Sequence, residues 1–216
     1  MSEKKNIRRE SKAKVLALSP EQRREASAAI FRQIAESHYF RRARCVAAYI
    51  SLSDEPQTED FLAEICRLVR VVVPRVEGSF ISFYDYRPDH LQRGAFGICE
   101  PDSDCTPCPV GQIDLAIVPG TAFTASGQRL GRGGGFYDRL LAHPDFRATT
   151  IGVCFDVQIV DRLPAEPYDR PVDMVVTEKK REIKKDGPNR PSIFEISPSN
   201  DATPSSTDRE LSGRTE

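Results

Sequence analysis

The segment from Arg129 to Asp138 combines glycine, arginine and aspartate in a pattern suited to binding a polyphosphate. It reads Arg-Leu-Gly-Arg-Gly-Gly-Gly-Phe-Tyr-Asp, and a helix is expected to begin at Phe136. Glycines remove the Cβ atoms that keep a backbone away from a ligand, and amides at a helix N-terminus attract anions. Arg129 and Arg132 carry guanidinium groups suited to forked phosphate contacts, and Asp138 carries a hard oxygen suited to Mg²⁺. The alternative interpretation is a glycine-rich surface turn flanked by solvated arginines.

This segment differs from the two common glycine-rich nucleotide motifs. It is not a P-loop, because no Gly-Lys-Ser/Thr follows at the required spacing. The dinucleotide-binding motif turns directly from a strand into a helix, whereas here residues 121–130 follow the strand expected to end near Pro119. The residues alone therefore predict an α/β enzyme that binds a nucleotide or polyphosphate, with Mg²⁺ as a candidate cofactor.

Composition excludes several other classes of protein. The 216 residues include 31 Lys and Arg against 32 Asp and Glu, a net charge of −1 that gives no sign of nucleic-acid binding. Apolar runs fall short of the roughly 20 residues that span a bilayer. The charged N-terminus lacks the apolar core of a secretory signal. We therefore expect a cytoplasmic protein without a membrane or nucleic-acid partner. A monomer is also expected, although composition does not determine the oligomeric state.

The six cysteines fit a reducing compartment. Cys45, Cys66 and Cys154 lie in apolar segments and are expected to be small core residues. Metal-like spacing occurs at Cys105 and Cys108, with Cys99 just upstream, but no second pair or suitably spaced histidine accompanies them. Ordinary loop cysteines are the favoured interpretation, and a zinc or redox site is the alternative.

The elements that must position the glycine-rich segment are a series of strands and helices. Two helices are expected in the first forty residues, the second beginning at the capping box Ser19-Pro-Glu-Gln22. A further helix is expected over about residues 58–70. Apolar runs predict strands over 45–52, 71–74, 80–84, 114–119, 150–155 and 173–176.

Continuous apolar strands that alternate with helices predict an α/β fold, a three-layer αβα sandwich with a mainly parallel sheet. We expect one domain over residues 1–180. Ligands bind beyond the carboxyl ends of such strands, so the loops after Leu52, Val118 and Phe155 should share one crevice. Residues 181–216 are rich in Ser, Pro, Thr, Asn and Asp, a composition that predicts a disordered tail.

Five collinear motifs resemble the signature of the 5-formyltetrahydrofolate cyclo-ligases, also called methenyltetrahydrofolate synthetases. The most specific motif consists of Val-Pro-Gly-Thr-Ala-Phe at 118–123 together with the glycine-rich stretch at 127–139. The other motifs are the Lys-x-x-x-Arg start at 4–8, Tyr-Ile-Ser-Leu-Ser-Asp-Glu at 49–55 followed by Thr58, Ile-Cys-Glu-Pro at 98–101, and Pro-Ala-Glu-Pro-Tyr-Asp-Arg-Pro-Val-Asp at 164–173. Their order and spacing are kept from residue 4 to about residue 178.

The resemblance implies ring closure of 5-formyltetrahydrofolate to 5,10-methenyltetrahydrofolate, dependent on ATP and Mg²⁺ and releasing ADP and phosphate. In that scheme the formyl oxygen takes the γ-phosphoryl group, the neighbouring folate amine attacks the activated carbon, and phosphate leaves. Such a reaction depends on positioning and charge neutralisation more than on a protein nucleophile. The alternatives are a folate- or nucleotide-binding homologue with weak or lost turnover, and a different α/β enzyme acting on sugar phosphates or coenzyme A esters.

The resemblance also implies roles for individual residues. The implied ATP contacts are Lys4, Lys5, Asn6, Ile7, Arg8, Arg129, Leu130, Gly131, Arg132, Gly133, Gly134, Gly135, Phe136 and Tyr137. The implied folate contacts are Arg8, Ile50, Glu55, Arg132, Gly133, Gly134, Gly135 and Phe136. Asp138 and Asp169 are implied to hold Mg²⁺, and the catalytic residues are expected to be Arg132, Tyr137 and Glu55.

Each implied role has a simpler alternative. Ile50 could be a core residue and Lys4 a solvated one; Asp169 could form a turn, and Asp138 could stabilise the start of its helix. The chain also departs from the family pattern at two positions. Phe136 stands where the family usually has tyrosine, which removes a hydroxyl contact, and Tyr168 stands where histidine is common.

Overall fold

A computed structural model of the chain describes residues 2–94 and 97–179. Its α-helices are α1 (Glu3–Ala17), α2 (Pro20–Ala35), α3 (His38–Arg42), α4 (Glu59–Ile65) and α5 (Phe136–Leu141). The predicted domain end at residue 180 and the predicted disordered tail over 181–216 both lie outside the described residues.

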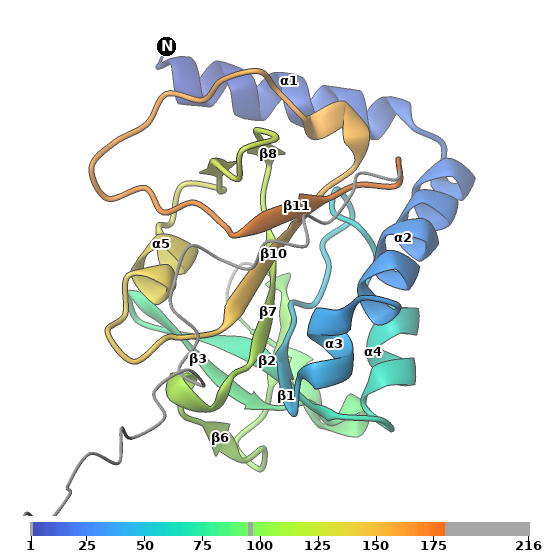
Figure 1. Cartoon of the computed structure of the whole chain (residues 1–216), viewed down its shortest axis with the longest axis vertical. Helices are drawn as coiled ribbons and strands as arrows, with labels where there is room; N and C mark the ends of the chain where they lie inside the picture. The colour runs from blue at the N-terminus through green and yellow to red at the C-terminus, as the bar shows by residue number, and fades with distance from the viewer. Residues whose placement is uncertain (1, 95–96, 180–216) are drawn as a thin grey trace, which may run out of the picture.

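A seven-stranded sheet forms the centre of the molecule (Figure 1). Its order is β11-β10-β7-β1-β2-β3-β6. The bounds are β1 Cys45–Ala47, β2 Arg70–Glu77, β3 Phe80–Asp85, β6 Pro107–Cys108, β7 Leu115–Pro119, β10 Thr149–Val153 and β11 Met174–Val176. The strands from β11 to β2 run parallel, whereas β3 is antiparallel to both β2 and β6. The prediction of a mainly parallel sheet is confirmed.

Helices cover both faces of this sheet, with α2, α3 and α4 on one face and α5 on the other (Figure 1). Residues of the central strands alternate between two apolar clusters. Val71 and Val73 belong to the cluster that contains Ile30 of α2, whereas Val72 belongs to the cluster that contains Leu140 of α5. Burial on both faces explains why Val71, Val72 and Val73 are apolar at successive positions. The predicted three-layer αβα sandwich is confirmed.

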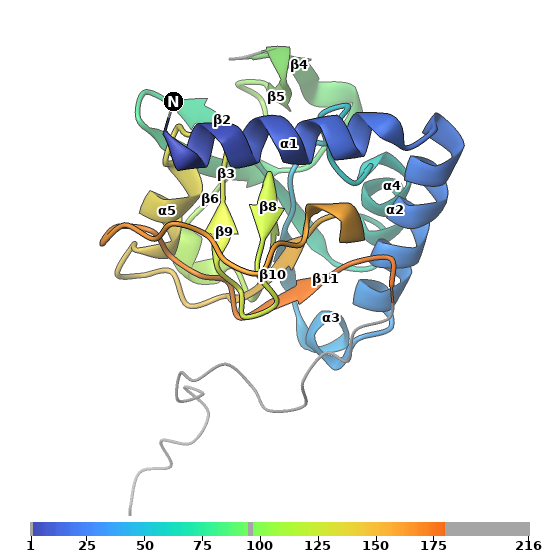
Figure 2. The same ribbon diagram turned by 90° about the horizontal axis from the view of Figure 1, so that it is seen from above.

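The first helix lies across the end of the molecule that carries the ribbon of β8 (Ala122–Phe123) and β9 (Arg129–Leu130) (Figure 2). Ile7 of α1 packs against an apolar cluster that includes Leu130. The second helix begins as predicted, because Ser19 and Gln22 exchange side chain–backbone hydrogen bonds in a capping box. A second small ribbon joins β4 (Leu91–Arg93) to β5 (Cys99–Pro101).

Strand β1 is shorter than the predicted run over 45–52, because its backbone leaves the sheet once the Ala48 amide has donated to the Val72 carbonyl. The amide of Ser51 donates to the Thr58 hydroxyl, and the amide of Leu52 donates to the Glu55 carboxylate. These side chains satisfy the backbone in place of a neighbouring strand. The segment 48–55 therefore becomes a loop beyond the carboxyl end of β1.

The predicted helix over 58–70 is also shorter, since α4 ends at Ile65 and β2 already begins at Arg70, which pairs with Cys45. Strand β3 reverses direction relative to β2. The connection between these strands holds Gly78 with φ 62°, a left-handed conformation suited to glycine. So short a connection permits only an antiparallel pair.

Candidate active site

A pocket of about 430 Å³ lies at the carboxyl ends of β1 and β7, between the glycine-rich loop and the β2–β3 hairpin. The lining residues are Tyr49, Ile50, Leu52, Glu55, Pro74, Val76, Ile81, Ile98, Cys99, Glu100, Pro119, Gly120, Arg129, Gly131, Arg132, Gly134, Gly135, Phe136, Tyr137 and Asp138. The loops after Leu52 and Val118 thus share a crevice, as predicted. The loop after Phe155 does not line it; instead its Gln158 donates to the carbonyl of Thr121 and supports the pocket from behind.

Most of the residues expected to form the site come together around this pocket. Those that line it are Ile50, Glu55, Arg129, Gly131, Arg132, Gly134, Gly135, Phe136, Tyr137 and Asp138. Those that do not line it are Lys4, Lys5, Asn6, Ile7, Arg8, Leu130, Gly133 and Asp169. Leu130 is instead a core residue, 3% exposed. Lys4 and Arg8 reach the surroundings of the pocket from α1.

The glycine-rich loop has a backbone that requires glycine at two positions. Gly133 and Gly135 have φ values of 107° and 68°, in the left-handed region. Gly135 is also the N-cap residue of α5. A Cβ at Gly134 would lie 2.7 Å from the Phe136 ring, so the ring packs directly against the loop. The glycines therefore serve both backbone conformation and close packing.

Arg132 reaches from this loop to two acids in the loop after β1. Its Nη2 lies 2.6 Å from Asp54 Oδ1 and 2.9 Å from Glu55 Oε1, and its Nε lies 3.0 Å from the same Glu55 oxygen. Burial raises the pKa of Glu55, although the Arg132 charge opposes this shift. Burial would also raise the pKa of Asp54, but hydrogen bonds and charge from Arg132 outweigh it and lower that pKa.

Arg129 and Asp138 form a second ion pair, deeper in the pocket. The Nη2–Oδ1 distance is 2.8 Å, and the two side chains are 3% and 17% exposed. The Nε of Arg129 is buried and finds no hydrogen-bond partner among the described residues. Buried polar atoms are almost always hydrogen-bonded, so this orphaned donor is suited to an anionic ligand. Burial raises the pKa of the neighbouring Tyr137 well above its usual value, which keeps its hydroxyl protonated.

Helix α1 contributes two basic side chains beside the pocket. Lys4 Nζ lies 2.8 Å from both Glu166 Oε2 and Asp169 Oδ2. Arg8 Nε donates to the carbonyl of Gly131 at 2.8 Å, which ties α1 to the glycine-rich loop. Burial would raise the pKa of Asp169, but the hydrogen bonds from Lys4 and from the Glu166 amide, together with the Lys4 charge, lower it.

The two acids predicted to hold Mg²⁺ thus each pair with a cation of the protein, Asp138 with Arg129 and Asp169 with Lys4. Carboxylate oxygens are the donors that Mg²⁺ prefers, and both side chains supply them. The donor chemistry fits Mg²⁺, provided that the paired cations turn to other anions when the metal binds.

Sequence reasoning missed several residues of the pocket. Asp54, which stands in the motif at 49–55 without an assigned role, lies beside the pocket and shares Arg132 with Glu55. Ile98, Cys99 and Glu100 line the pocket wall from the β4–β5 ribbon. The motif at 98–101 was a signal for them, although it carried no assigned role.

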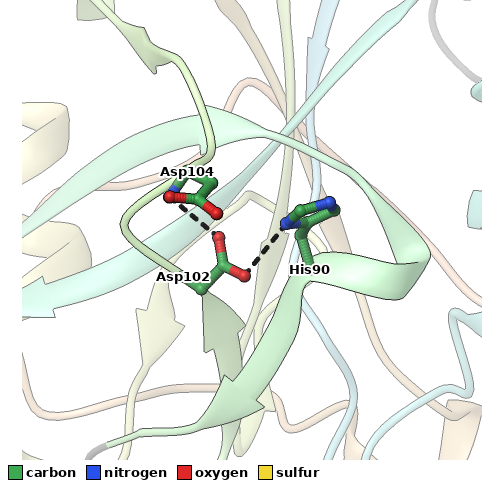
Figure 3. Close-up of side chains that lie close together, drawn as sticks. All are labelled: His90, Asp102 and Asp104. Atoms are coloured by element: carbon green, nitrogen blue, oxygen red, sulfur yellow. Dashed lines mark hydrogen bonds and ion pairs between the residues drawn. The ribbon is translucent and has the colours of Figure 1, made fainter.

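The cysteines with metal-like spacing do not gather in the structure. Cys99 is exposed, and Cys108 is buried with its Sγ 3.9 Å from that of Cys45. Within residues 2–94 and 97–179, the group of three potential metal ligands that lie close together is His90, Asp102 and Asp104 (Figure 3). His90 Nδ1 lies 3.0 Å from Asp102 Oδ2, and the backbone amide of Asp104 donates to the other oxygen of Asp102. These bonds stabilise the turn after β5.

The part of the chain that the structure describes includes no helix with the length and apolar character needed to cross a membrane.

Comparison with known proteins places the chain in a family. The sequence profile of the 5-formyltetrahydrofolate cyclo-ligase family matches residues 1–178. The 5-formyltetrahydrofolate cyclo-ligase of Escherichia coli K12 is 33% identical over 172 residues, which cover 76% of this chain and 94% of the relative. That of Mycolicibacterium smegmatis is 36% identical over 145 residues, or 63% of this chain and 75% of the relative. The NMR structure of Aquifex aeolicus 5,10-methenyltetrahydrofolate synthetase superimposes with a TM-score of 0.76 at 33% identity, covering 90% of this chain and 99% of that one. The chain therefore belongs to the 5-formyltetrahydrofolate cyclo-ligase family, a family of ligases.

Proposed function

We propose that this chain converts 5-formyltetrahydrofolate into 5,10-methenyltetrahydrofolate, using ATP and Mg²⁺ and releasing ADP and phosphate. The observation that carries the proposal is a single pocket in which an apolar wall faces an arginine- and glycine-rich loop. A folate needs the first surface and a triphosphate needs the second. The reaction requires both ligands in contact.

The apolar wall suits a flat ring with polar edges. It is formed by Ile50, Leu52, Pro74, Val76, Ile81 and Ile98, and Phe136 lies on the loop that also lines the pocket. Glu55 is 6% exposed at the polar end of this wall. We propose that its carboxylate accepts hydrogen bonds from the N–H groups of the pterin, since a buried acceptor favours a ligand that donates to it.

The opposite surface suits phosphate oxygens. Arg129 has a buried donor without a partner among the described residues, and the loop brings Gly131, Gly134 and Gly135 to the pocket. We propose that these groups and Arg8 and Lys4 of α1 bind the triphosphate. When the formyl oxygen takes the γ-phosphoryl group, negative charge is spread over the transferring oxygens. We propose that Arg132 neutralises that charge and that Tyr137 acts as a hydrogen-bond donor.

Ring closure then requires few further groups. The folate amine attacks the carbon of the phosphorylated formyl group and loses its proton, and the oxygen departs with phosphate. In our proposal the protein supplies orientation and charge, so that no protein nucleophile is needed. Asp138 and Asp169 would hold Mg²⁺, which neutralises phosphate charge when bound.

We also propose that the protein acts as a cytoplasmic monomer on small molecules alone. The near-zero net charge of −1 supports the absence of a nucleic-acid partner. Light scattering coupled to size-exclusion chromatography tests the monomer, and a larger mass would refute it.

The direct test of the activity mixes purified protein with 5-formyltetrahydrofolate, ATP and Mg²⁺ and follows the absorbance of methenyltetrahydrofolate. We expect product only when all three are present. A protein that binds the folate tightly but forms no product at high enzyme concentration would be a binding homologue, and the proposal would be wrong.

A further inference from the structure

Arg139 of α5 links two walls of the pocket that are far apart in the sequence. Its Nε donates to the carbonyl of Ser79 at 2.7 Å, and its Nη2 donates to the carbonyl of Gly134 at 2.7 Å. Ser79 lies in the turn between β2 and β3, and Gly134 lies in the glycine-rich loop. One guanidinium group therefore holds the hairpin and the loop together.

Two aromatic rings flank the same guanidinium. Its carbon atom lies 5.8 Å from the centroid of the Phe80 ring and 5.3 Å from that of the Phe136 ring. Both distances are within the range of cation–π attraction. Phe80 belongs to the hairpin and is 60% exposed, whereas Phe136 lines the pocket. Through these rings, as through the two carbonyls, Arg139 connects the β2–β3 hairpin with the glycine-rich loop.

The bond to Gly134 determines how the loop presents its backbone. All described peptide bonds are trans, and in a trans peptide the carbonyl points away from the next amide. Because Arg139 holds the Gly134 carbonyl, the Gly135 amide is directed away from the guanidinium. Gly135 itself lines the pocket. A Cβ there would lie 2.8 Å from Arg139 Nη1, so loop and arginine fit closely.

The bond to Ser79 connects Arg139 to the opposite wall of the pocket. Strands β2 and β3 bring Pro74, Val76 and Ile81 to the apolar side of the pocket. A register of paired residues from Val72–Asp85 to Glu77–Phe80 holds these strands together independently of Arg139. The arginine therefore adds the alignment of the hairpin with the glycine-rich loop rather than the hairpin itself.

We propose that Arg139 is a positioning residue that holds the glycine-rich loop in its ATP-binding conformation against the β2–β3 hairpin. This inference rests on the proposed function, because it assigns the loop to ATP. It predicts that loss of the two carbonyl bonds weakens ATP binding while leaving the apolar folate wall in place.

The test compares the wild type with Arg139→Met and Arg139→Lys. Methionine keeps apolar bulk between the rings but donates no hydrogen bond, and lysine keeps a charged donor without the fork. Arg41→Met is the matched control, since the Arg41 guanidinium also donates to a backbone carbonyl, that of Glu36, outside the pocket. Two quantities are measured: the shift in unfolding temperature caused by Mg-ATP, and kcat with KM for each substrate.

We expect Arg139→Met to lose most of the Mg-ATP-induced shift and to raise KM for ATP by about tenfold, the scale of one charge-assisted hydrogen bond. KM for 5-formyltetrahydrofolate should change by less than about threefold. Arg139→Lys should recover part of both effects, and Arg41→Met should resemble the wild type. An unchanged ATP-induced shift in Arg139→Met would overturn the inference, as would an equal rise in both KM values. If wild-type protein binds ATP but forms no product, the proposed activity fails while the thermal shifts still decide the role of Arg139.

Discussion

Glu55 is held by two opposing influences, burial that disfavours its charge and a guanidinium that favours it. Burial is the larger, and the pKa of Glu55 lies above its usual value. The folded protein therefore retains the Glu55 proton to higher pH than the unfolded chain does. The contribution of Glu55 to the stability of the fold is present below about pH 4.5 and is lost as the pH rises through the raised pKa of the folded state. This cost in stability is consistent with a residue kept for binding.

Glu55→Gln tests that interpretation. The substitution keeps shape but removes the carboxylate proposed to accept from the pterin, so KM for 5-formyltetrahydrofolate should rise by about tenfold or more. Stability at pH 7 should stay the same or increase, because an ionisation that folding disfavours is gone. Urea unfolding between pH 4.5 and pH 7 measures this, and the variant should show a flatter dependence than the wild type. Glu64→Gln, on the exposed side of α4, is the control; an unchanged folate KM in Glu55→Gln would contradict the role.

Substitution of Asp138 can distinguish a role in metal binding from a role in structural pairing. Its Oδ1 accepts from Arg129 and from the backbone amide of Arg170, and asparagine can accept both bonds. Asp138→Asn should therefore cost no more than about 1 kcal/mol of stability. Its turnover should fall by about a hundredfold if the carboxylate holds Mg²⁺, the scale of removing one electrostatic group from a transition state. Steady-state kinetics measured against Mg²⁺ concentration test this role, with the exposed Asp145→Asn as the control. If Asp138→Asn turned over as fast as the wild type, a metal role for Asp138 would be excluded.

Residues of the pocket can be predicted from the sequence more readily than the residues with which they pair. The glycines, Arg129, Arg132 and Asp138 stand in one short motif, so local spacing was enough to place them together. The pairing of Arg132 with Asp54 joins two loops separated by several strands. Such a contact depends on the order of strands in the sheet, which no local pattern in the sequence contains.

At the scale of elements, α1 is not part of either helical layer of the sandwich. It lies beside the pocket and connects two loops there. Lys4 pairs with Glu166 and Asp169, and Arg8 binds the Gly131 carbonyl, so its first turns contact two separate loops. Periodicity predicted the helix but not where it would dock. The same limit applies to the β8–β9 ribbon, in which each strand has only two residues.

Lys4→Met should release the first turn of α1. Partly exposed ion pairs contribute at most about 1 kcal/mol each, so global stability should change little. Hydrogen exchange at the amides of residues 5–8 should become faster, and KM for ATP should rise if Lys4 turns to the phosphates when Mg²⁺ takes Asp169. Lys14→Met, in the last turn of the same helix, is the control. If hydrogen exchange at these amides matched the wild type, the docking of the first turn of α1 would not depend on Lys4.

At the scale of the whole molecule, the sheet order places β1 and β7 side by side at the centre. The loops that leave their carboxyl ends carry Glu55 and lead to Arg129, which is why residues more than seventy positions apart face one pocket. The alternation of apolar strands and helices predicted this general location. It did not predict the antiparallel β2–β3 hairpin, whose residues form the opposite wall.

The location of the pocket also predicts that residues 181–216 are not needed for activity. Every lining residue lies between Tyr49 and Asp138, and α1 and the 164–173 loop complete its surroundings. Residues 181–216 have a composition that buries little apolar surface. A chain ending at Lys180 should therefore keep kcat, both KM values and the unfolding temperature of the full chain. Parallel kinetics and calorimetry on the two proteins test this, with Ser19→Ala in each as an internal standard for a loss of about 1 kcal/mol from one helix cap. A large loss of activity with an unchanged unfolding temperature would mean that the removed segment closes over the pocket, and the site would then extend beyond the domain.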